Sequence, residues 1–225
     1  MNTKDSIKAS IIDVARLMYE KQMVNALEGN ISCRIGDTVI ITPSGVCKGY
    51  LQADMLLTLD MDGNVLEGTR KPSSETKIHL AAYRIRPDIR AAAHSHPPFA
   101  TAYAIANLPI ATKSYPEAIV NFDHIPIAGY GRPSTDEVHR DFAWLLPQTD
   151  VLLLSNHGVM SVGSDVFDAF FKMETAESIA KTLTIAKLHG GEKALSPERL
   201  DELYAMRKEN LGKGKITTVP HGTSS

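Results

Sequence analysis

The chain has little of several features that would place it in a specialised class of protein. Its 225 residues include only two cysteines, Cys33 and Cys47, too few for a disulfide framework and not arranged as CxxC, so we expect free thiols. No block of Lys or Arg occurs, and the formal net charge is −2. This charge pattern argues against nucleic acid or an anionic membrane as the main partner, and a small ligand is expected instead.

Long apolar runs are missing as well. The N-terminal sequence MNTKDSIKAS lacks the apolar stretch of a signal peptide, and no segment approaches the roughly 20 apolar residues that cross a bilayer, so we expect a cytoplasmic protein with no membrane partner. Internal repeats and low-complexity linkers are also absent. We therefore predict a single domain over residues 1–210 and a flexible C-terminal tail over 211–225, which is rich in Gly, Lys, Thr and Ser.

Hydrophobic periodicity predicts an α/β protein in which helices alternate with strands. The expected helices are 6–24 with Ser6 as N-cap, Ser73 or Ser74 to Arg86, 98–106, 135–146, 165–189, and a last helix that begins at Ser196-Pro197. The expected strands are 29–34, 38–42, 56–60, 65–67, 89–96, 151–154 and 159–162. Residues 115–123 are expected to form a loop, and Asp62-Gly63-Asn64 is a hairpin signal that makes the early sheet antiparallel.

The most informative motif is His94-Ser95-His96, because the two-residue period of a strand points both imidazoles to one face. A third imidazole, His157, follows another apolar run, and Glu75 lies in the first turn of a predicted helix. Three imidazoles and a carboxylate suit a zinc-like divalent cation. A glutamate in that turn is also favoured simply by the helix dipole. An ordinary surface or hydrogen-bonded role is expected for the other histidines: His79, His124, His139, His189 and His221.

Three short motifs upstream offer donors for a bound anion. They are Gly29-Asn30-Ile31-Ser32, Thr42-Pro43-Ser44-Gly45 and Ser73-Ser74. Hydroxyl, amide and glycine N–H groups can surround a phosphate without a lysine, and a helix N-terminus favours negative charge. Each motif alone is as typical of a turn, a strand start or a helix cap. Their position before the expected metal ligands favours the anion site.

With these motifs in this order, the chain resembles the class II aldolase/adducin family from residue 6 to about 190. The resemblance implies a three-layer α/β/α sandwich around a central mixed, mostly antiparallel sheet. It also implies one Zn²⁺ per subunit and a homotetramer with active sites between neighbouring subunits. The implied activity is a zinc-dependent aldolase that reversibly cleaves a short ketose phosphate, such as L-fuculose-1-phosphate, into dihydroxyacetone phosphate and an aldehyde.

The resemblance also implies roles for individual residues. His94, His96 and His157 would be zinc ligands, and Glu75 would be the fourth ligand and the catalytic base. The residues expected to hold the substrate phosphate are Asn30, Ser44, Gly45, Ser73 and Ser74, with Gly29 and Thr42 shaping their loops. The proton donor stays open among Tyr115, Glu117 and Tyr130.

Three other activities also stay open. A sugar-phosphate 4-epimerase would use the same metal, and a methylthioribulose-1-phosphate dehydratase-like lyase resembles the chain around Glu117. A non-catalytic adducin-like scaffold is disfavoured, because all four ligand residues are present and a long basic tail is not.

Overall fold

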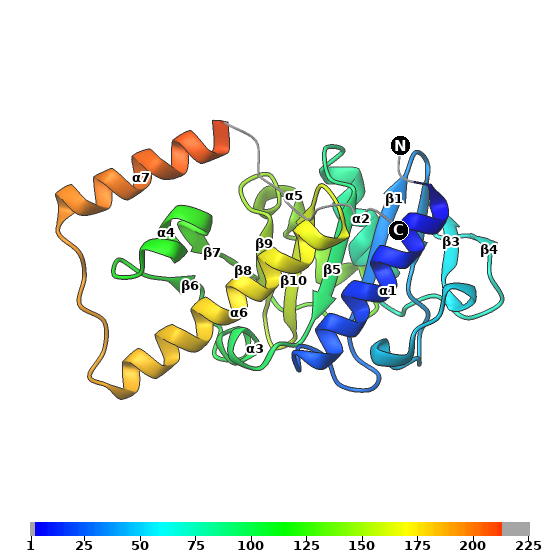
Figure 1. Cartoon of the computed structure of the whole chain (residues 1–225), viewed down its shortest axis with the longest axis horizontal. Coiled ribbons are helices and arrows are strands. Elements are labelled where there is room, and N and C mark those ends of the chain that lie inside the picture. Colours follow the sequence, from blue (N-terminus) through cyan, green and yellow to red (C-terminus); the bar gives the residue numbers. More distant parts are fainter. Residues whose placement is uncertain (1–2, 213–225) are drawn as a thin grey trace, which may run out of the picture.

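The computed structural model describes residues 3–212 and shows one central sheet with helices on both faces (Figure 1). Its eight strands lie in the order β4-β3-β2-β1-β5-β10-β9-β8. Every neighbouring pair is antiparallel except β8 and β9, which are parallel. These strands are β1 (Asn30–Ile35), β2 (Thr38–Ile41), β3 (Leu57–Asp60), β4 (Val65–Glu67), β5 (Ala91–Ser95), β8 (Ile127–Ala128), β9 (Val151–Leu154) and β10 (Gly158–Gly163). A separate pair is formed by β6 (Ile110–Ala111) and β7 (His124–Ile125).

The helices form one layer on each face of the sheet. The α-helices of the described residues are α1 (Lys4–Glu20), α2 (Thr76–Ile85), α3 (Pro98–Ile105), α4 (Pro116–Phe122), α5 (Phe142–Leu145), α6 (Val166–Leu188) and α7 (Pro197–Gly212). In Figure 1, α1 and α6 cross in front of the sheet, while α7 lies to one side above α4. Two 3₁₀ segments, η1 (Lys48–Tyr50) and η2 (Ala53–Met55), follow β2, and a third, η3 (Asp136–His139), precedes α5.

Two hydrophobic cores fill the spaces between these layers. In β5, Ala91 and Ala93 belong to the core under α1, α3 and α6, whereas Ala92 belongs to the core under α2 and α5. Side chains of a strand alternate between faces, so one strand can serve both cores. The predicted three-layer α/β/α sandwich around a mixed, mostly antiparallel sheet is therefore confirmed.

Several predicted boundaries are wrong for local reasons. The first helix begins at Lys4, because Thr3 rather than Ser6 is its N-cap: the Thr3 hydroxyl accepts the backbone N–H of Ser6 at 3.2 Å. It ends at Glu20, shortly before Gln22 takes a left-handed conformation with φ 58°.

The segment between β5 and β9 differs most from the prediction. The expected loop 115–123 contains α4, which starts with Pro116 in its first turn, a position where the missing N–H of proline has no helical partner to lose. The expected helix 135–146 is divided into η3 and α5. The hairpin at Asp62-Gly63-Asn64 is confirmed by the antiparallel pairing of β3 with β4.

The C-terminal elements begin where capping residues indicate. Asp165 caps α6 by accepting the N–H of Asp168 at 2.8 Å, and Ser196 accepts the N–H of Arg199 at 3.5 Å in the first turn of α7. Helix α7 continues through Gly212, so the predicted tail begins within it, and residues 213–225 lie outside the described part. Within the described part, no helix has both the length and the apolar character needed to cross a bilayer.

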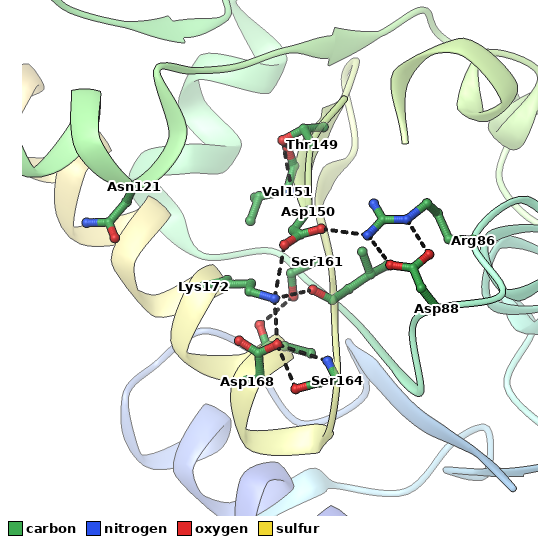
Figure 2. Close-up of polar contacts among 12 residues, drawn as sticks. Arg86, Asp88, Asn121, Thr149, Asp150, Val151, Ser161, Ser164, Asp168 and Lys172 are labelled. Carbon is green, nitrogen blue, oxygen red and sulfur yellow. Dashed lines mark hydrogen bonds and ion pairs between the residues drawn. The ribbon is translucent and has the colours of Figure 1, made fainter. Parts of the chain in front are cut away.

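A polar network ties α2, β9 and α6 together at one edge of the two cores (Figure 2). The Lys172 ammonium lies 2.6 Å from the Asp168 carboxylate and 3.1 Å from the Asp150 carboxylate. Arg86 pairs with Asp88 at 2.7 Å and with Asp150 at 3.2 Å. The side chains of Lys172 and its two acidic partners are at most 16 % exposed, so these ion pairs lie largely out of water.

Candidate metal centre and anion pocket

Three histidines from two strand ends meet at one point of the sheet. His94 is in β5, His96 follows that strand, and His157 lies in the turn between β9 and β10. Their ligand nitrogens all lie within 4.8 Å of one another. Antiparallel pairing of β10 with β5 sets Val159 opposite Ser95 and so brings the turn beside the His94-Ser95-His96 motif. The predicted convergence of the three imidazoles is therefore present in the structure.

Gly158 lets the backbone come this close to the imidazole rings. A Cβ at this position would lie 2.5 Å from the Cδ2 of His96 and 2.6 Å from the backbone oxygen of Ser95. It would also lie 3.3 Å from the Cε1 of His94. Any residue other than glycine would push the strand away from the histidines.

Glu75 completes the group from the start of α2, in a helical layer that packs on the sheet. Its carboxylate oxygens lie 3.1 Å from the Nε2 of His94 and 3.0 Å from the Nε2 of His157. Glu75 is the N-cap residue of α2 rather than part of its first turn, and its side chain makes no capping bond. The Ser73 hydroxyl accepts the N–H of Glu75 at 3.3 Å, so the predicted Ser73 cap serves the turn before the helix. The carboxylate of Glu75 is thus free to face the histidines.

The hydrogen bonds of the rings test whether a cation fits among these atoms. His94 donates its Nδ1–H to the carbonyl oxygen of Val159 at 2.9 Å, because a carbonyl can only accept. In the neutral ring, Nε2 then presents a lone pair 3.1 Å from the Nε2 of His96 and 3.1 Å from Glu75. Two arrangements relieve the repulsion between these atoms: a proton on the ring, since Glu75 outweighs burial and raises the pKa of His94, or a cation bound among them. A tetrahedral zinc ion with Zn–N bonds of about 2.0–2.1 Å would hold its donor atoms about 3.3 Å apart, so the donor set and its spacing fit a divalent cation.

The mutual influence of these groups also appears in their proton affinities. Burial opposes ionisation of Glu75, but His94 and His157 outweigh it and hold the pKa of the carboxyl well below its usual range. Burial and the neighbouring histidines lower the pKa of His96 to about 4, which leaves its ring neutral and able to ligate. Its Nδ1 lies 3.5 Å from the Glu28 carboxylate, a partner that orients the ring as metal-binding imidazoles require.

A pocket of about 210 Å³ opens beside this group, and Glu75, His96 and His157 line it. It is lined by Leu27, Glu28, Gly29, Asn30, Pro43, Ser44, Lys48, Ser73, Ser74, Glu75, His96 and His157. Five of the seven predicted phosphate residues are among them. The other two shape the walls: the Thr42 hydroxyl accepts the N–H of Ile31 at 3.2 Å, and Gly45 takes the left-handed conformation with φ +71° that favours glycine.

Backbone contacts join two of the predicted anion motifs into one wall of the pocket. A β-bridge links Pro43 with Pro72, and the N–H of Ser44 donates to the carbonyl of Lys71 at 2.9 Å. These contacts place the TPSG turn next to the Ser73-Ser74 pair, although the two motifs are far apart in the sequence.

Lys48 is a pocket residue that sequence reasoning missed. It is only 2 % exposed, and within the described part of the chain its ammonium donates to one acceptor, the carbonyl of Val46 at 2.9 Å. Burial lowers the pKa of this lysine. Among the described residues, a buried lysine without a carboxylate partner on the wall of a pocket rich in hydroxyl donors marks a candidate anion ligand, and only the fold reveals this burial.

The three proton-donor candidates do not line this pocket. Tyr115 is half-buried against the core at the N-terminus of α4, and Glu117 is in the first turn of that helix. Tyr130 is 54 % exposed in the loop after β8. One copy of the chain therefore does not bring any of them to the histidines.

Comparisons with known proteins agree with the motifs and the fold. The family model described as class II aldolase and adducin N-terminal domain matches residues 9–184. The chain is 35 % identical over 181 residues to the L-fuculose phosphate aldolase of Methanocaldococcus jannaschii, covering 80 % of this chain and 97 % of that protein. It is 33 % identical over 179 residues to the 3-oxo-tetronate 4-phosphate decarboxylase of Haemophilus influenzae, covering 77 % of this chain and 85 % of the relative.

A solved structure of an L-fuculose 1-phosphate aldolase superimposes with a TM-score of 0.83 and 28 % sequence identity, covering 92 % of this chain and 98 % of the other. The names of these relatives specify two different reactions, aldol cleavage and decarboxylation. Both reactions break a carbon–carbon bond of a phosphorylated substrate. The chain therefore belongs to the class II aldolase and adducin family, and it is a lyase-type enzyme of that family.

Proposed function

We propose that the protein is a zinc-dependent aldehyde-lyase that reversibly cleaves a short ketose phosphate into dihydroxyacetone phosphate and an aldehyde. L-fuculose-1-phosphate and related deoxy-pentulose or hexulose phosphates are the proposed substrates. The carrying observation is the convergence of three imidazoles and the Glu75 carboxylate at the wall of a pocket that also contains Lys48. The similarity to proteins named L-fuculose phosphate aldolase supports the substrate class.

In this proposal His94, His96, His157 and Glu75 hold the cation. A bound divalent cation would polarise the substrate carbonyl and stabilise negative charge that develops on its oxygen. Glu75 acts as the base, because its carboxylate stays ionised and reaches the pocket. It would remove the proton from the carbon beside the carbonyl in the synthetic direction and return it during cleavage.

The substrate phosphate would bind among the hydroxyl and lysine side chains of the same pocket. Ser44, Ser73 and Ser74 provide hydroxyl or backbone N–H donors there, and Lys48 provides positive charge. Asn30 also lines the pocket, and one N–H of its amide donates to Glu75 at 2.9 Å. Charge-assisted hydrogen bonds to phosphate oxygens are stronger than neutral ones, so the lysine adds to what the serines supply.

The proton donor for the far oxygen would come from a neighbouring subunit. Tyr115, Glu117 and Tyr130 lie outside the pocket of their own chain, which supports a donor supplied by a second copy. We therefore propose a cytoplasmic homotetramer with active sites between subunits. Mass photometry of the purified protein checks the stoichiometry, which should be four times the 24.6 kDa chain.

Decarboxylation of a 3-oxo sugar-acid phosphate is the second candidate reaction. The 33 % identity to a named 3-oxo-tetronate 4-phosphate decarboxylase favours it. The same cation site would stabilise the charge left when carbon dioxide departs, so the reactions differ in the group that leaves rather than in the metal.

A substrate screen tests the proposed function. The zinc-loaded protein is assayed for aldehyde release from fuculose-, rhamnulose- and ribulose-1-phosphates and for carbon dioxide release from 3-oxo acid phosphates. Aldehyde release is expected, with one zinc per subunit by elemental analysis. Glu75→Gln should retain most of the metal and lose roughly 100-fold or more in kcat, as expected when a general base is removed.

The matched control is Glu174→Gln, because Glu174 pairs with Lys21 on the outside of α6 and lies away from the pocket. This variant should keep its activity. Near-normal turnover by the Glu75 variant would remove Glu75 from the proposed role, and carbon dioxide without aldehyde would select the second candidate.

A further inference from the structure

A chain of buried hydrogen bonds runs from the Glu75 carboxylate into the space between β1 and α2. Glu75 accepts from the Asn30 amide at 2.9 Å, and the other end of that amide meets the Nε2 of His79 at 2.5 Å. The Nδ1 of His79 lies 2.7 Å from the Ser32 hydroxyl, which lies 2.7 Å from the Tyr83 hydroxyl.

Helical and strand periods bring these residues together. Glu75, His79 and Tyr83 are spaced by four along one side of α2, while Asn30 and Ser32 are spaced by two on one face of β1. The four residues behind Glu75 are at most 3 % exposed, so water cannot replace a lost partner. Leaving one of these groups without a partner would carry a desolvation penalty.

The direction of each hydrogen bond follows from what its partner can do. A carboxylate only accepts, so the Asn30 amide must turn an N–H toward Glu75 and its oxygen toward His79. That oxygen also only accepts, so the Nε2 of His79 must carry the hydrogen. In the neutral ring, Nδ1 then accepts from Ser32, whose oxygen accepts from Tyr83. Every donor in the chain therefore points toward the carboxylate.

We infer that His79 is a positioning residue, present as the neutral Nε2–H tautomer with Ser32 donating to its Nδ1, and that it fixes the Asn30 amide so that an N–H faces Glu75. If the other tautomer formed, the lone pair of Nε2 would face the Asn30 oxygen, and the amide would turn its oxygen toward the carboxylate. Glu75 would then lose the donor that holds it between the histidines and the pocket. Burial also favours the neutral ring, since it lowers the pKa of His79 to about 3.

The inference deepens the proposed function, because it assigns the support of the proposed base. Its first test needs no substrate. Two-bond ¹H–¹⁵N spectra of the full-length, zinc-loaded protein labelled in histidine report the tautomer of each ring, and the His79 signals are those lost in His79→Gln. The Nε2–H pattern is expected for His79, and an Nδ1–H or doubly protonated pattern would overturn the inference.

Kinetics supply the second test. Ser32→Ala removes the donor to Nδ1, so kcat should fall by roughly 10-fold or more, as for other residues that orient a metal-site group, while KM and zinc content stay close to those of the parent. Ser161→Ala is the matched control, since it removes another fully buried strand hydroxyl, which donates to the carbonyl of Ala169 at 2.7 Å. Its kcat should be unchanged even if its melting temperature falls.

A conservative pair guards against a variant that does not fold. His79→Gln keeps an N–H donor for Asn30 and should retain more kcat than His79→Leu, which offers none. Equal kcat in the two variants, or full activity in Ser32→Ala, would overturn the positioning role. If no sugar phosphate is turned over while the spectra show the Nε2–H tautomer, the proposed function fails and the tautomer assignment holds.

Discussion

Lys48 is a cation held almost entirely away from water. Its ammonium has three hydrogens and donates one of them to the neutral carbonyl of Val46. A neutral partner offsets only part of the desolvation penalty, which is why burial lowers the pKa of this lysine. A phosphate in the pocket would supply the missing negative charge, so the unfavourable burial of Lys48 fits a role in binding.

Replacing this lysine should weaken substrate binding without harming the fold. In Lys48→Met the KM for the phosphorylated substrate should rise roughly 30-fold or more, because a bound phosphate would lose a largely desolvated cation. The melting temperature should be unchanged or higher, since an unpaired buried charge is removed. Steady-state kinetics and thermal unfolding measure both effects. Lys77→Met is the control, because Lys77 is half-exposed and pairs with Asp136 at 3.0 Å. An unchanged KM in Lys48→Met would contradict the phosphate role.

His79 should make the folded protein sensitive to mild acid. Its pKa falls from 6.5 to about 3 on folding, chiefly through burial and then through the charge of His94, although Glu75 opposes this. Below pH 6.5 the His79 ring binds a proton in the unfolded chain but not in the folded chain. Its contribution to the free energy of unfolding is therefore fully present above that pH and declines as the pH falls toward 3. Urea unfolding from pH 7 to 5 should show a smaller decline in His79→Gln. Identical slopes would mean that folding does not lower the pKa of this ring.

The residues of the metal centre could be predicted for a simple reason. Strand period alone places His94 and His96 together, and a third histidine beside a glycine at a strand end is a local pattern. Lys48 escaped prediction because its burial comes from contacts distant in sequence, and a lysine near a Gly-Tyr turn reads as a surface residue. The hydrogen-bonded role of His79 was expected, but its partners Asn30 and Ser32 depend on how a helix and a strand are packed.

At the scale of elements, the network around Lys172 joins a helix from each outer layer to the sheet (Figure 2). Lys172 in α6 meets Asp150 just before β9, and Asp150 in turn meets Arg86 at the end of α2. The two layers have separate hydrophobic cores, so this network is a polar link between them.

Removing the central cation of the network should therefore destabilise the whole fold. Lys172→Ala would leave the Asp168 and Asp150 carboxylates short of positive charge in a largely buried place, and about 3–5 kcal/mol of unfolding free energy should be lost. Lys21→Ala breaks an exposed ion pair with Glu174, which lies in α6 as Lys172 does. This variant should lose less than about 1 kcal/mol of unfolding free energy. Urea denaturation measures both. Equal losses would show that burial adds nothing to the Lys172 contacts.

Long elements followed the sequence pattern more closely than short ones. Helix α6 spans 23 residues, and the predicted range 165–189 agrees with its observed bounds to within one residue at each end. Helix α4 has only 7 residues, too few for apolar spacing to repeat, so its proline start was mistaken for a loop. The division between η3 and α5 escaped prediction because the Thr135 and Asp141 starts are both short local turns within one apolar pattern.

For the whole molecule, the strand order could not be derived from periodicity, since β1 and β5 are neighbours although helix α2 and the three strands β2, β3 and β4 separate them in sequence. The family resemblance implied a mixed, mostly antiparallel sheet but no strand order. The arrangement matters because the four proposed ligands come from β5, the β9–β10 turn and the start of α2. A cation bound there would connect the sheet to one helical layer.

Metal removal should accordingly lower global stability. A ligand at about 1,000 times its Kd stabilises a protein by about 4 kcal/mol, so chelator treatment should lower the melting temperature and added zinc should restore it. Differential scanning fluorimetry with and without chelator measures the shift. His96→Ala should melt at one temperature under both conditions. An unchanged melting temperature of the parent protein in the presence of the chelator would contradict the proposed metal centre.

The absence of a side chain at Gly158 affects the order in which the cation and the substrate would bind. Backbone closes against the imidazoles on that side, and His94 is fully buried, whereas His96 and His157 face the pocket. The cation and the sugar phosphate would thus reach the site through the same pocket. A bound sugar phosphate would block the path of the cation behind it. We therefore expect zinc to bind before the substrate and to be released only after the product has left.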